Sequence, residues 1–262
     1  MKFGNKMLSK PLEIGNALND FFLGKIEDLK RNDFSNEDPN SELRDFLKEK
    51  IVPGFSLREI SWEETKKLIK NMKGKRSCGL DWICGFSLKM AAPELISEIT
   101  ALMNISIRTG KFYSKWKLSK ILPYYKQKGS KSDCKFYRPV SNLAEISKLQ
   151  EKIVHKQVSD YLSSNDLLHP SHHGFLEHHS TATALHQIVD TWLKAADTGK
   201  LSATLFLDLK AGFDVIEHRV LLSKLQEYGF CETTLAWFEN YLEKRYQCVQ
   251  IESILSDLKK IK

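Results

Sequence analysis

A short apolar run that ends at a carboxylate constrains the fold more than any other feature of this chain. Residues 201–207 read Leu-Ser-Ala-Thr-Leu-Phe-Leu, and Asp208 follows directly. The run is typical of a β-strand, in which Thr204, Phe206 and Asp208 would share one face. A carboxylate at a strand end, followed by a small residue and then by the aromatic Phe213, suits a site for a divalent metal beside a nucleotide. The alternative is that Asp208 only caps a turn at the end of the strand.

Amphipathic helices and further short strands occupy most of the remaining sequence. Apolar residues at helical spacing predict helices over residues 12–29, from the capping box at Ser61, and over 88–108, 146–162, about 180–193, about 220–229 and 232–245. Strands are expected over residues 120–125, 136–141, 201–208 and 246–254. The polar stretch 32–41 is expected to be a linker. The mixture of helices and strands predicts an α+β fold.

The positive charge of the chain gathers in one segment. The formal net charge is +7, and residues 115–138 contain eight basic residues against the single acid Asp133. Aromatic residues interleave with them, and the two strands expected there would form a hairpin able to lie over a nucleotide. This pattern suits neutralisation of phosphates together with stacking on bases, although a solvated lysine surface is the alternative. The nucleic-acid-binding candidates are Lys115, Lys117, Lys120, Lys128 and Lys131.

Length and composition favour an intracellular globular protein. A chain of 262 residues can form one large domain, or one domain with an appended segment. Its five cysteines are scattered and odd in number, which favours reduced thiols over a disulfide framework. No apolar run approaches the roughly 20 residues that span a bilayer. Residues 1–10 also lack the pattern of a secretory signal. We therefore expect no membrane partner.

Five sequence blocks occur in a fixed order between residues 61 and 254. They are Lys75–Ile83, Trp116–Lys117 with Leu88–Lys89 before it, Tyr137–Leu143, His173–Leu185 and Leu207–Asp214. In this order they resemble the reverse transcriptase of non-LTR retrotransposons of the long interspersed element type. Three positions depart from the family pattern: Leu176 replaces an arginine, His178 replaces a glycine and Gly212 replaces an alanine.

The resemblance implies an architecture and a set of partners. It implies a partial right-hand polymerase, with fingers and an incomplete palm, preceded by a helical N-terminal extension. Residues 1–60 would be the helical connecting region and linker, and residues 61–262 the partial reverse transcriptase domain. The partners would be an RNA template, a DNA primer and deoxynucleoside triphosphates, with Mg²⁺ as the cofactor. The resemblance also implies a nuclear place of action, and it leaves the oligomeric state open.

The resemblance also implies roles for individual residues. Asp208 would be a catalytic carboxylate and a Mg²⁺ ligand, and the carbonyl of Leu209 would be a second ligand. Arg138 and Lys126 would hold the triphosphate of the incoming nucleotide, for which the arginine fork is suited. Phe213 would stack beneath the nucleotide sugar and exclude a 2′-hydroxyl. The alternatives are a core aromatic for Phe213 and ordinary surface charges for the basic residues.

Two blocks of the family do not occur in the 262 residues. The Gly-x-Pro-Gln-Gly block and the Ala-Asp-Asp turn would follow Ile254, and the chain contains no adjacent pair of aspartates. Mg²⁺ takes several hard oxygen ligands, so a polymerase site needs further carboxylates beside Asp208. We therefore expect a truncated polymerase that is inactive by itself. The alternatives are a non-catalytic nucleic-acid-binding remnant and a decayed retroelement fragment without activity.

Overall fold

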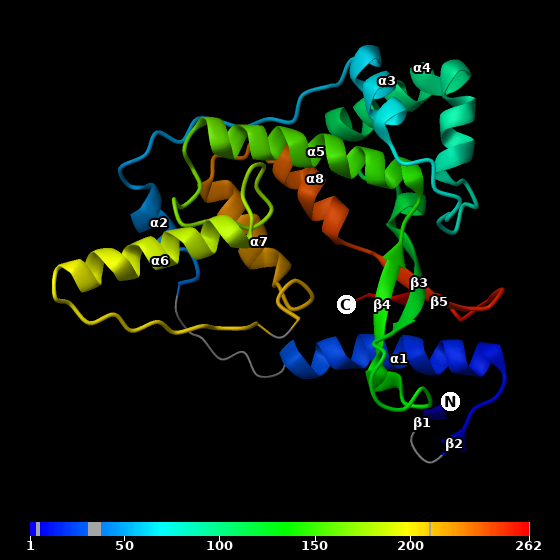
Figure 1. The fold of residues 1–262 in the computed structure, drawn as a ribbon. Coiled ribbons are helices and arrows are strands. Elements are labelled where there is room, and N and C mark those ends of the chain that lie inside the picture. Colours follow the sequence, from blue (N-terminus) through cyan, green and yellow to red (C-terminus); the bar gives the residue numbers. More distant parts are fainter. Residues whose placement is uncertain (4–5, 31–37, 210, 262) are drawn as a thin grey trace.

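The computed structural model describes residues 1–3, 6–30, 38–209 and 211–261 (Figure 1). Its α-helices are α1 (Pro11–Lys30), α2 (Ser41–Leu47), α3 (Trp62–Asn71), α4 (Gly85–Thr109), α5 (Glu145–Ser164), α6 (Thr181–Asp197), α7 (His218–Glu227) and α8 (Glu232–Leu242). Its strands are β1 (Lys2–Phe3), β2 (Lys6–Met7), β3 (Leu118–Tyr125), β4 (Tyr137–Asn142), β5 (Tyr246–Ile251), β6 (Ile254–Leu255) and β7 (Lys259–Lys260). Two 3-10 helices, η1 (Ser114–Lys117) and η2 (Cys134–Phe136), complete the elements. The fold is therefore α+β, as expected.

Helix boundaries follow the capping signals in the sequence. Ser61 opens α3 with a capping box, in which its hydroxyl accepts from the Glu64 amide and the Glu64 carboxylate accepts from the Ser61 amide. Ser180 caps α6 through the Thr183 amide. Gly110 ends α4 in the left-handed region, with φ of 64°. Within the described residues, no helix combines the length and the apolar character that a membrane crossing requires.

The main sheet joins the expected basic hairpin to a strand from the end of the chain. Its order is β4–β3–β5–β6, and β7 also pairs with β5. Strands β3 and β4 form the antiparallel hairpin, with Lys120 opposite Asn142 and Tyr125 opposite Tyr137. Strand β5 runs parallel to β3, and this register places Leu118 opposite Tyr246. Residues just before β3 and just before β5 are thereby brought side by side.

Helix α1 lies across this sheet (Figure 1). Its Leu18 and Phe22 pack against Ile121 of β3 and Val249 of β5. The buried Asn19 amide donates to the Asp257 carbonyl at 3.0 Å, and its Oδ1 accepts from the side chain of Gln247 at 2.9 Å. The helix expected in the connecting region is therefore part of the core around the sheet. Of the expected linker 32–41, residues 32–37 lie outside the described residues.

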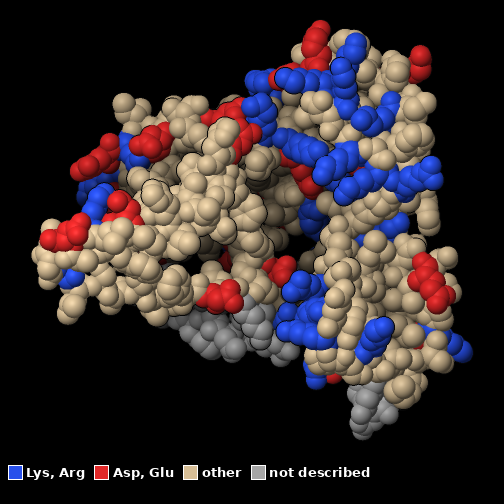
Figure 2. All heavy atoms as spheres, in the orientation of Figure 1, with Lys and Arg blue, Asp and Glu red and all other residues tan. Residues whose placement is uncertain are grey.

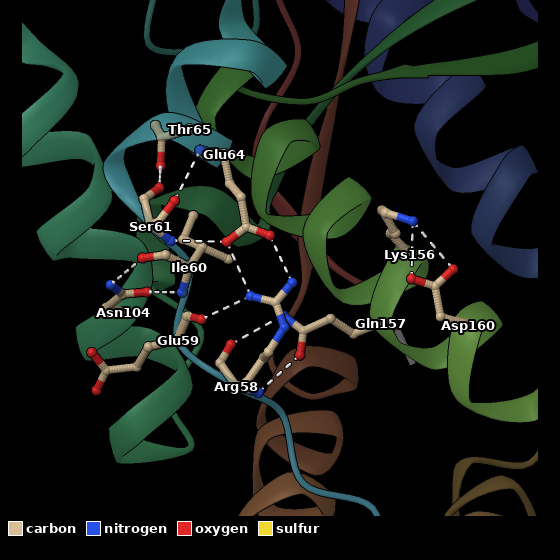
Figure 3. Close-up of polar contacts among 10 residues, drawn as sticks. All are labelled: Arg58, Glu59, Ile60, Ser61, Glu64, Thr65, Asn104, Lys156, Gln157 and Asp160. Carbon is tan, nitrogen blue, oxygen red and sulfur yellow. Dashed lines mark hydrogen bonds and ion pairs between the residues drawn. The ribbon is translucent and has the colours of Figure 1, made fainter. Parts of the chain in front are cut away.

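A second layer of helices holds the segment that precedes α3 (Figure 3). Asn104 of α4 pairs with the backbone of Ile60 through both its oxygen and its nitrogen, at 2.8 and 2.9 Å. Gln157 of α5 does the same to the backbone of Arg58, at 2.8 and 3.0 Å. The Arg58 guanidinium binds both oxygens of Glu64 and lowers the pKa of that carboxyl to about 2. These contacts fix α3 against α4 and α5.

Gly79 explains why the glycine of the first sequence block is needed. The loop before α4 passes so close to the start of α5 that a Cβ at Gly79 would lie 2.7 Å from the Ala144 nitrogen and 2.9 Å from the Leu143 carbonyl carbon. The Asn142 side chain also donates to the Cys78 carbonyl at 2.7 Å. Only a residue without a side chain permits this approach of two backbone segments.

The substitution Gly79→Ala is expected to lower the free energy of unfolding by about 1–3 kcal/mol, because backbone atoms must move to relieve the clash. Urea denaturation followed by tryptophan fluorescence measures the loss. Gly74→Ala in the same loop is the matched control, since its Cβ would only touch the Lys89 side chain at 3.9 Å. Equal midpoints for the two variants would contradict the close approach.

The strand expected over residues 201–208 is wrong. The segment 201–209 has no regular secondary structure, and its apolar side chains are exposed, with Leu205 at 81% and Leu207 at 80%. A β-strand is stabilised by a neighbouring strand and by packing on a face. No strand pairs with this segment in the part of the chain that the structure describes. Asp208 therefore lies on an exposed, unpaired segment rather than at a strand end.

Candidate functional site

A cavity of about 420 Å³ lies between α1, the main sheet and the turn 211–214. Its basic lining residues come from four parts of the chain: Lys25 from α1, Lys117 from η1, Lys126 and Lys135 from the hairpin, and Arg245 from the residues before β5. Asp214 is the only acid among the described residues that line it. Figure 2 shows lysine and arginine side chains that extend from the α3–α4 end of the molecule down to α1, beside a hollow near the middle of the view. A cavity with this charge attracts polyanions such as phosphates.

Lys126 lies in the most crowded part of this positive charge. Its Nζ donates to the Lys135 carbonyl at 2.6 Å. Burial lowers the pKa of Lys126, and the nearby charges of Lys25, Arg138 and Lys128 lower it further. Mutual repulsion of this kind is relieved when an anion binds, so the arrangement favours a phosphate ligand at Lys126.

The two faces of the hairpin carry different candidates. Tyr137, Pro139 and Ser141 line the cavity, whereas Arg138, between two of them on β4, is absent from the lining and is exposed. Alternation along a strand explains the separation. Lys120 is buried, and its Nζ lies 4.9 Å from the centre of the Trp82 ring. The charges of Lys126 and Arg138 are therefore close enough to affect each other. Only Lys126 lines the cavity.

Three of the basic candidates, Lys115, Lys128 and Lys131, do not line this cavity. Lys128 and Lys131 are exposed in the hairpin turn, and Lys131 lies over the Tyr125 ring at 5.7 Å. Lys115 is exposed in η1 and lines a second hollow of about 710 Å³ together with Lys111 and Lys244. These three candidates are accessible to a nucleic-acid strand but do not converge on one point.

The segment around Asp208 reaches the cavity only through its final turn. Asp208 and Leu209 are exposed and are not part of the lining. Phe213 is 78% exposed and packs edge-on against Phe175, with ring centres 5.6 Å apart. Asp214, for which the sequence indicated no role, lines the cavity. The turn 211–214 thus brings this block to the cavity edge.

The described residues do not by themselves provide a complete magnesium site. Within them, no three His, Cys, Asp or Glu side chains are grouped so as to hold a metal ion. Asp208 and the Leu209 carbonyl would offer two oxygen ligands, fewer than the octahedral shell of Mg²⁺ takes. The magnesium role of Asp208 and Leu209 therefore remains a prediction about a larger assembly of ligands.

Two cations that line the cavity lie outside the basic segment recognised in the sequence. Lys25 is one lysine on an amphipathic helix far from the basic segment, and Arg245 follows Lys244 just after α8. No local pattern distinguishes either from a surface charge. They join the site only because α1 docks on β5 and because β5 pairs with β3.

Comparison with known proteins shows the family that the sequence resembles. The family model described as reverse transcriptase (RNA-dependent DNA polymerase) matches residues 126–258, about half of the chain. The chain is 27% identical over 223 residues to the probable RNA-directed DNA polymerase from transposon BS of Drosophila melanogaster, covering 85% of this chain and 24% of that protein. It is 26% identical over 215 residues to the corresponding probable polymerase from transposon X-element of the same species, covering 82% and 24%.

A third relative agrees with these two. The RNA-directed DNA polymerase from mobile element jockey of Drosophila melanogaster is 23% identical over 220 residues, covering 84% of this chain and 24% of that protein. The chain thus spans about a quarter of the length of the curated relatives it matches. The chain belongs to the reverse transcriptase family, as the reverse transcriptase domain of a non-LTR retrotransposon of the long interspersed element type.

Proposed function

We propose that residues 61–262 form the fingers and the first part of the palm of an RNA-directed DNA polymerase, with residues 1–60 as its connecting region. The observation that carries the proposal is the basic cavity of about 420 Å³. Most of its lining comes from the segment that matches the family model, from Lys126 to Gln247. A cavity with five cations and one acid suits the phosphates of a nucleotide or of a nucleic-acid strand.

In this proposal each candidate contributes a simple interaction. Lys126 binds phosphate in the cavity, and Arg138 binds phosphate from the outer face of the hairpin. Phe213 stacks on the sugar of the incoming nucleotide. Asp208 and the Leu209 carbonyl supply oxygen ligands to Mg²⁺ once further carboxylates join them. Template, primer and deoxynucleoside triphosphates are the proposed partners.

A polypeptide restricted to these 262 residues is expected to give no primer extension. Two-metal nucleotidyl transfer requires several carboxylates in one place, and the metal contribution is worth several kcal/mol, with each 1.36 kcal/mol equal to about tenfold in rate. The assay uses a poly(rA) template, an oligo(dT) primer, dTTP and Mg²⁺, with an active reverse transcriptase as the positive control. Template-dependent extension by the purified polypeptide would overturn the proposed incompleteness of the site.

Nucleic-acid binding by the same polypeptide is expected to be weak and dependent on salt. The triple variant Lys126→Ala, Lys128→Ala, Arg138→Ala should weaken binding of single-stranded RNA. It should also reduce the slope of log K against log salt by about 2, or about 0.7 for each lost phosphate contact. Fluorescence anisotropy at several salt concentrations measures both effects.

The control variant for this experiment removes exposed charges elsewhere. Lys156→Ala with Lys194→Ala deletes two lysines that are ion-paired along helices to Asp160 and Asp190. Binding by this control should stay within twofold of the wild type. An unchanged salt slope in the triple variant would show that the hairpin charges are an ordinary solvated surface. RNA binding without primer extension under any assay condition would favour the alternative of a non-catalytic nucleic-acid-binding remnant.

A further inference from the structure

Lys117 is a buried cation that lacks an acidic partner. The residue is only 5% exposed. Its Nζ donates to the side-chain oxygen of Asn240 at 2.9 Å and also to the Asn240 carbonyl. Both acceptors are neutral, and no carboxylate forms an ion pair with Lys117 in the described part of the chain. Lysine is almost never buried unless its charge is paired, because desolvation of an ammonium group is costly.

The surroundings of Lys117 add to this cost. Burial lowers the pKa of Lys117, and the positive charge of Arg245 lowers it further. The negative charge of Glu243 raises the pKa of Lys117, and the positive charge of Lys244 lowers it. Two cations and one acid therefore surround the buried ammonium group. The free protein holds a positive charge here that a bound anion would stabilise.

Arg245 is the second cation of this pair, and one of its nitrogens is unsatisfied. Its Nε donates to the Tyr241 carbonyl at 2.7 Å, and its guanidinium lies 4.1 Å from the centre of the Tyr241 ring. One terminal nitrogen is buried without a hydrogen-bond partner. This same nitrogen makes a long ion pair with a carboxylate oxygen of Glu151, at 4.0 Å, and burial raises the pKa of Glu151. The ion pair with Glu151 is too long for a hydrogen bond, so a ligand oxygen within hydrogen-bond distance would stabilise this nitrogen.

The sheet topology explains why these two cations meet. Lys117 is the residue before β3, and Arg245 is the residue before β5. Since the two strands are parallel with Leu118 opposite Tyr246, the residues that precede them lie at the same end of the sheet. Both side chains line the 420 Å³ cavity. Lys117 also borders the second hollow, but Arg245 lines only the first of the two.

We propose that Lys117 and Arg245 form an anion subsite in the wall of the cavity and that this subsite binds a phosphate group. The guanidinium offers a fork that suits phosphate oxygens, and the ammonium adds a point charge beside it. Lys25, Lys126 and Lys135 line the same cavity and add to its positive charge, so a ligand with several phosphates fits better than a single carboxylate. The anion belongs to a nucleotide or to a nucleic-acid backbone. This identification of the anion rests on the proposed function, whereas the subsite itself is inferred from the geometry.

The test measures phosphate binding by the 262-residue chain and by three variants. The probes are inorganic pyrophosphate, dTTP and a single-stranded oligo(dT), each added in calorimetric titrations and in thermal melts. Lys117→Met keeps the length of the side chain and removes its charge, and Arg245→Gln removes the guanidinium. Lys194→Met is the control, because Lys194 is an exposed lysine of α6 that pairs with Asp190 and does not line the cavity.

The wild type and Lys194→Met should bind pyrophosphate with equal affinity and melt at a higher temperature in its presence. Lys117→Met and Arg245→Gln should each lose at least tenfold in affinity. Without pyrophosphate, Lys117→Met should be at least as stable as the wild type, because the variant no longer buries an unpaired charge. A purely structural lysine would give the opposite pattern, with a destabilised variant and unchanged pyrophosphate affinity.

The three probes show whether the bound phosphate belongs to a nucleotide or to a nucleic-acid strand. They also distinguish failure of the subsite proposal from failure of the polymerase proposal. Loss of dTTP binding assigns the subsite to the nucleotide, and loss of oligo(dT) binding assigns it to the strand. Affinities within twofold of wild type in both variants, or no binding of any probe by the wild type, would overturn the subsite. The polymerase proposal would survive the first of these results if the hairpin variant Lys126→Ala, Lys128→Ala, Arg138→Ala still weakened RNA binding.

Discussion

Replacing Trp237 by alanine is expected to lower the free energy of unfolding by about 3–5 kcal/mol, the usual range for removing a buried tryptophan. Trp237 of α8 is 1% exposed. Its ring stacks on Tyr241 with centres 5.2 Å apart and meets Phe112 edge-on at 5.5 Å. The indole nitrogen donates to the Ser106 hydroxyl at 3.1 Å. The substitution would leave a large cavity and an unpaired hydroxyl at the centre of the aromatic cluster.

Two control variants separate these contributions in urea denaturation. Trp237→Phe retains much of the ring volume and loses the hydrogen bond to Ser106, so we expect a smaller loss than for alanine. Trp192→Ala removes a tryptophan of α6 that is 36% exposed, and its expected cost is below about 1.5 kcal/mol. Similar losses of unfolding free energy for the alanine variants of Trp237 and Trp192 would contradict the position of Trp237 at the centre of the aromatic cluster.

The Trp237 cluster also supports the proposed phosphate subsite. Helix α8 presents Asn240, which holds Lys117, and Tyr241, which holds Arg245. The ring of Phe112 lies 5.6 Å from the Arg245 guanidinium. Loss of the Trp237 ring is therefore expected to weaken pyrophosphate binding along with stability, although Trp237 does not line the 420 Å³ cavity.

Elements governed by nearby residues were predictable from the sequence. Ser61 and Ser180 each supply an oxygen to the amide three residues later, and helices begin directly after both. Gly110 ends α4 in a conformation that glycine adopts without strain. The hairpin of β3 and β4 was expected from two short apolar runs around a polar turn. In each case the determining contacts lie within a few residues of one another.

Elements governed by distant partners were not predictable in the same way. The apolar run before Asp208 has the composition of a strand, yet the described residues provide it with no neighbour to pair with. Conversely, no local signal indicated that β5 would run parallel to β3 and bring Arg245 beside Lys117. The position of Lys25 depends in the same way on α1 docking across the sheet. The cavity as a whole is therefore a product of long-range packing.

Gly229 joins the N-terminal part of the chain to the helices that support the cavity. Its φ is 80°, and a Cβ there would lie 2.5 Å from the Pro53 carbonyl oxygen. The Gly229 carbonyl accepts from the Phe55 amide at 2.8 Å. The Tyr161 hydroxyl lies between the carbonyls of Pro53 and Tyr228, 2.6 Å from each. Segment 53–55, α5 and the turn between α7 and α8 therefore meet at one glycine.

Gly229→Ala is consequently expected to lower the free energy of unfolding by about 2–5 kcal/mol. Roughly 1–2 kcal/mol comes from the left-handed backbone, and about 1–3 kcal/mol comes from the displacement of Pro53. Gly199→Ala isolates the first contribution, because Gly199 has φ of 68° and no atom within 4 Å of its Cβ position. The difference between the two variants in urea denaturation measures the close approach. If both lost the same free energy, the Cβ at position 229 would have to be accommodated without strain, and the contact between segment 53–55 and the α7–α8 turn would contribute little to stability.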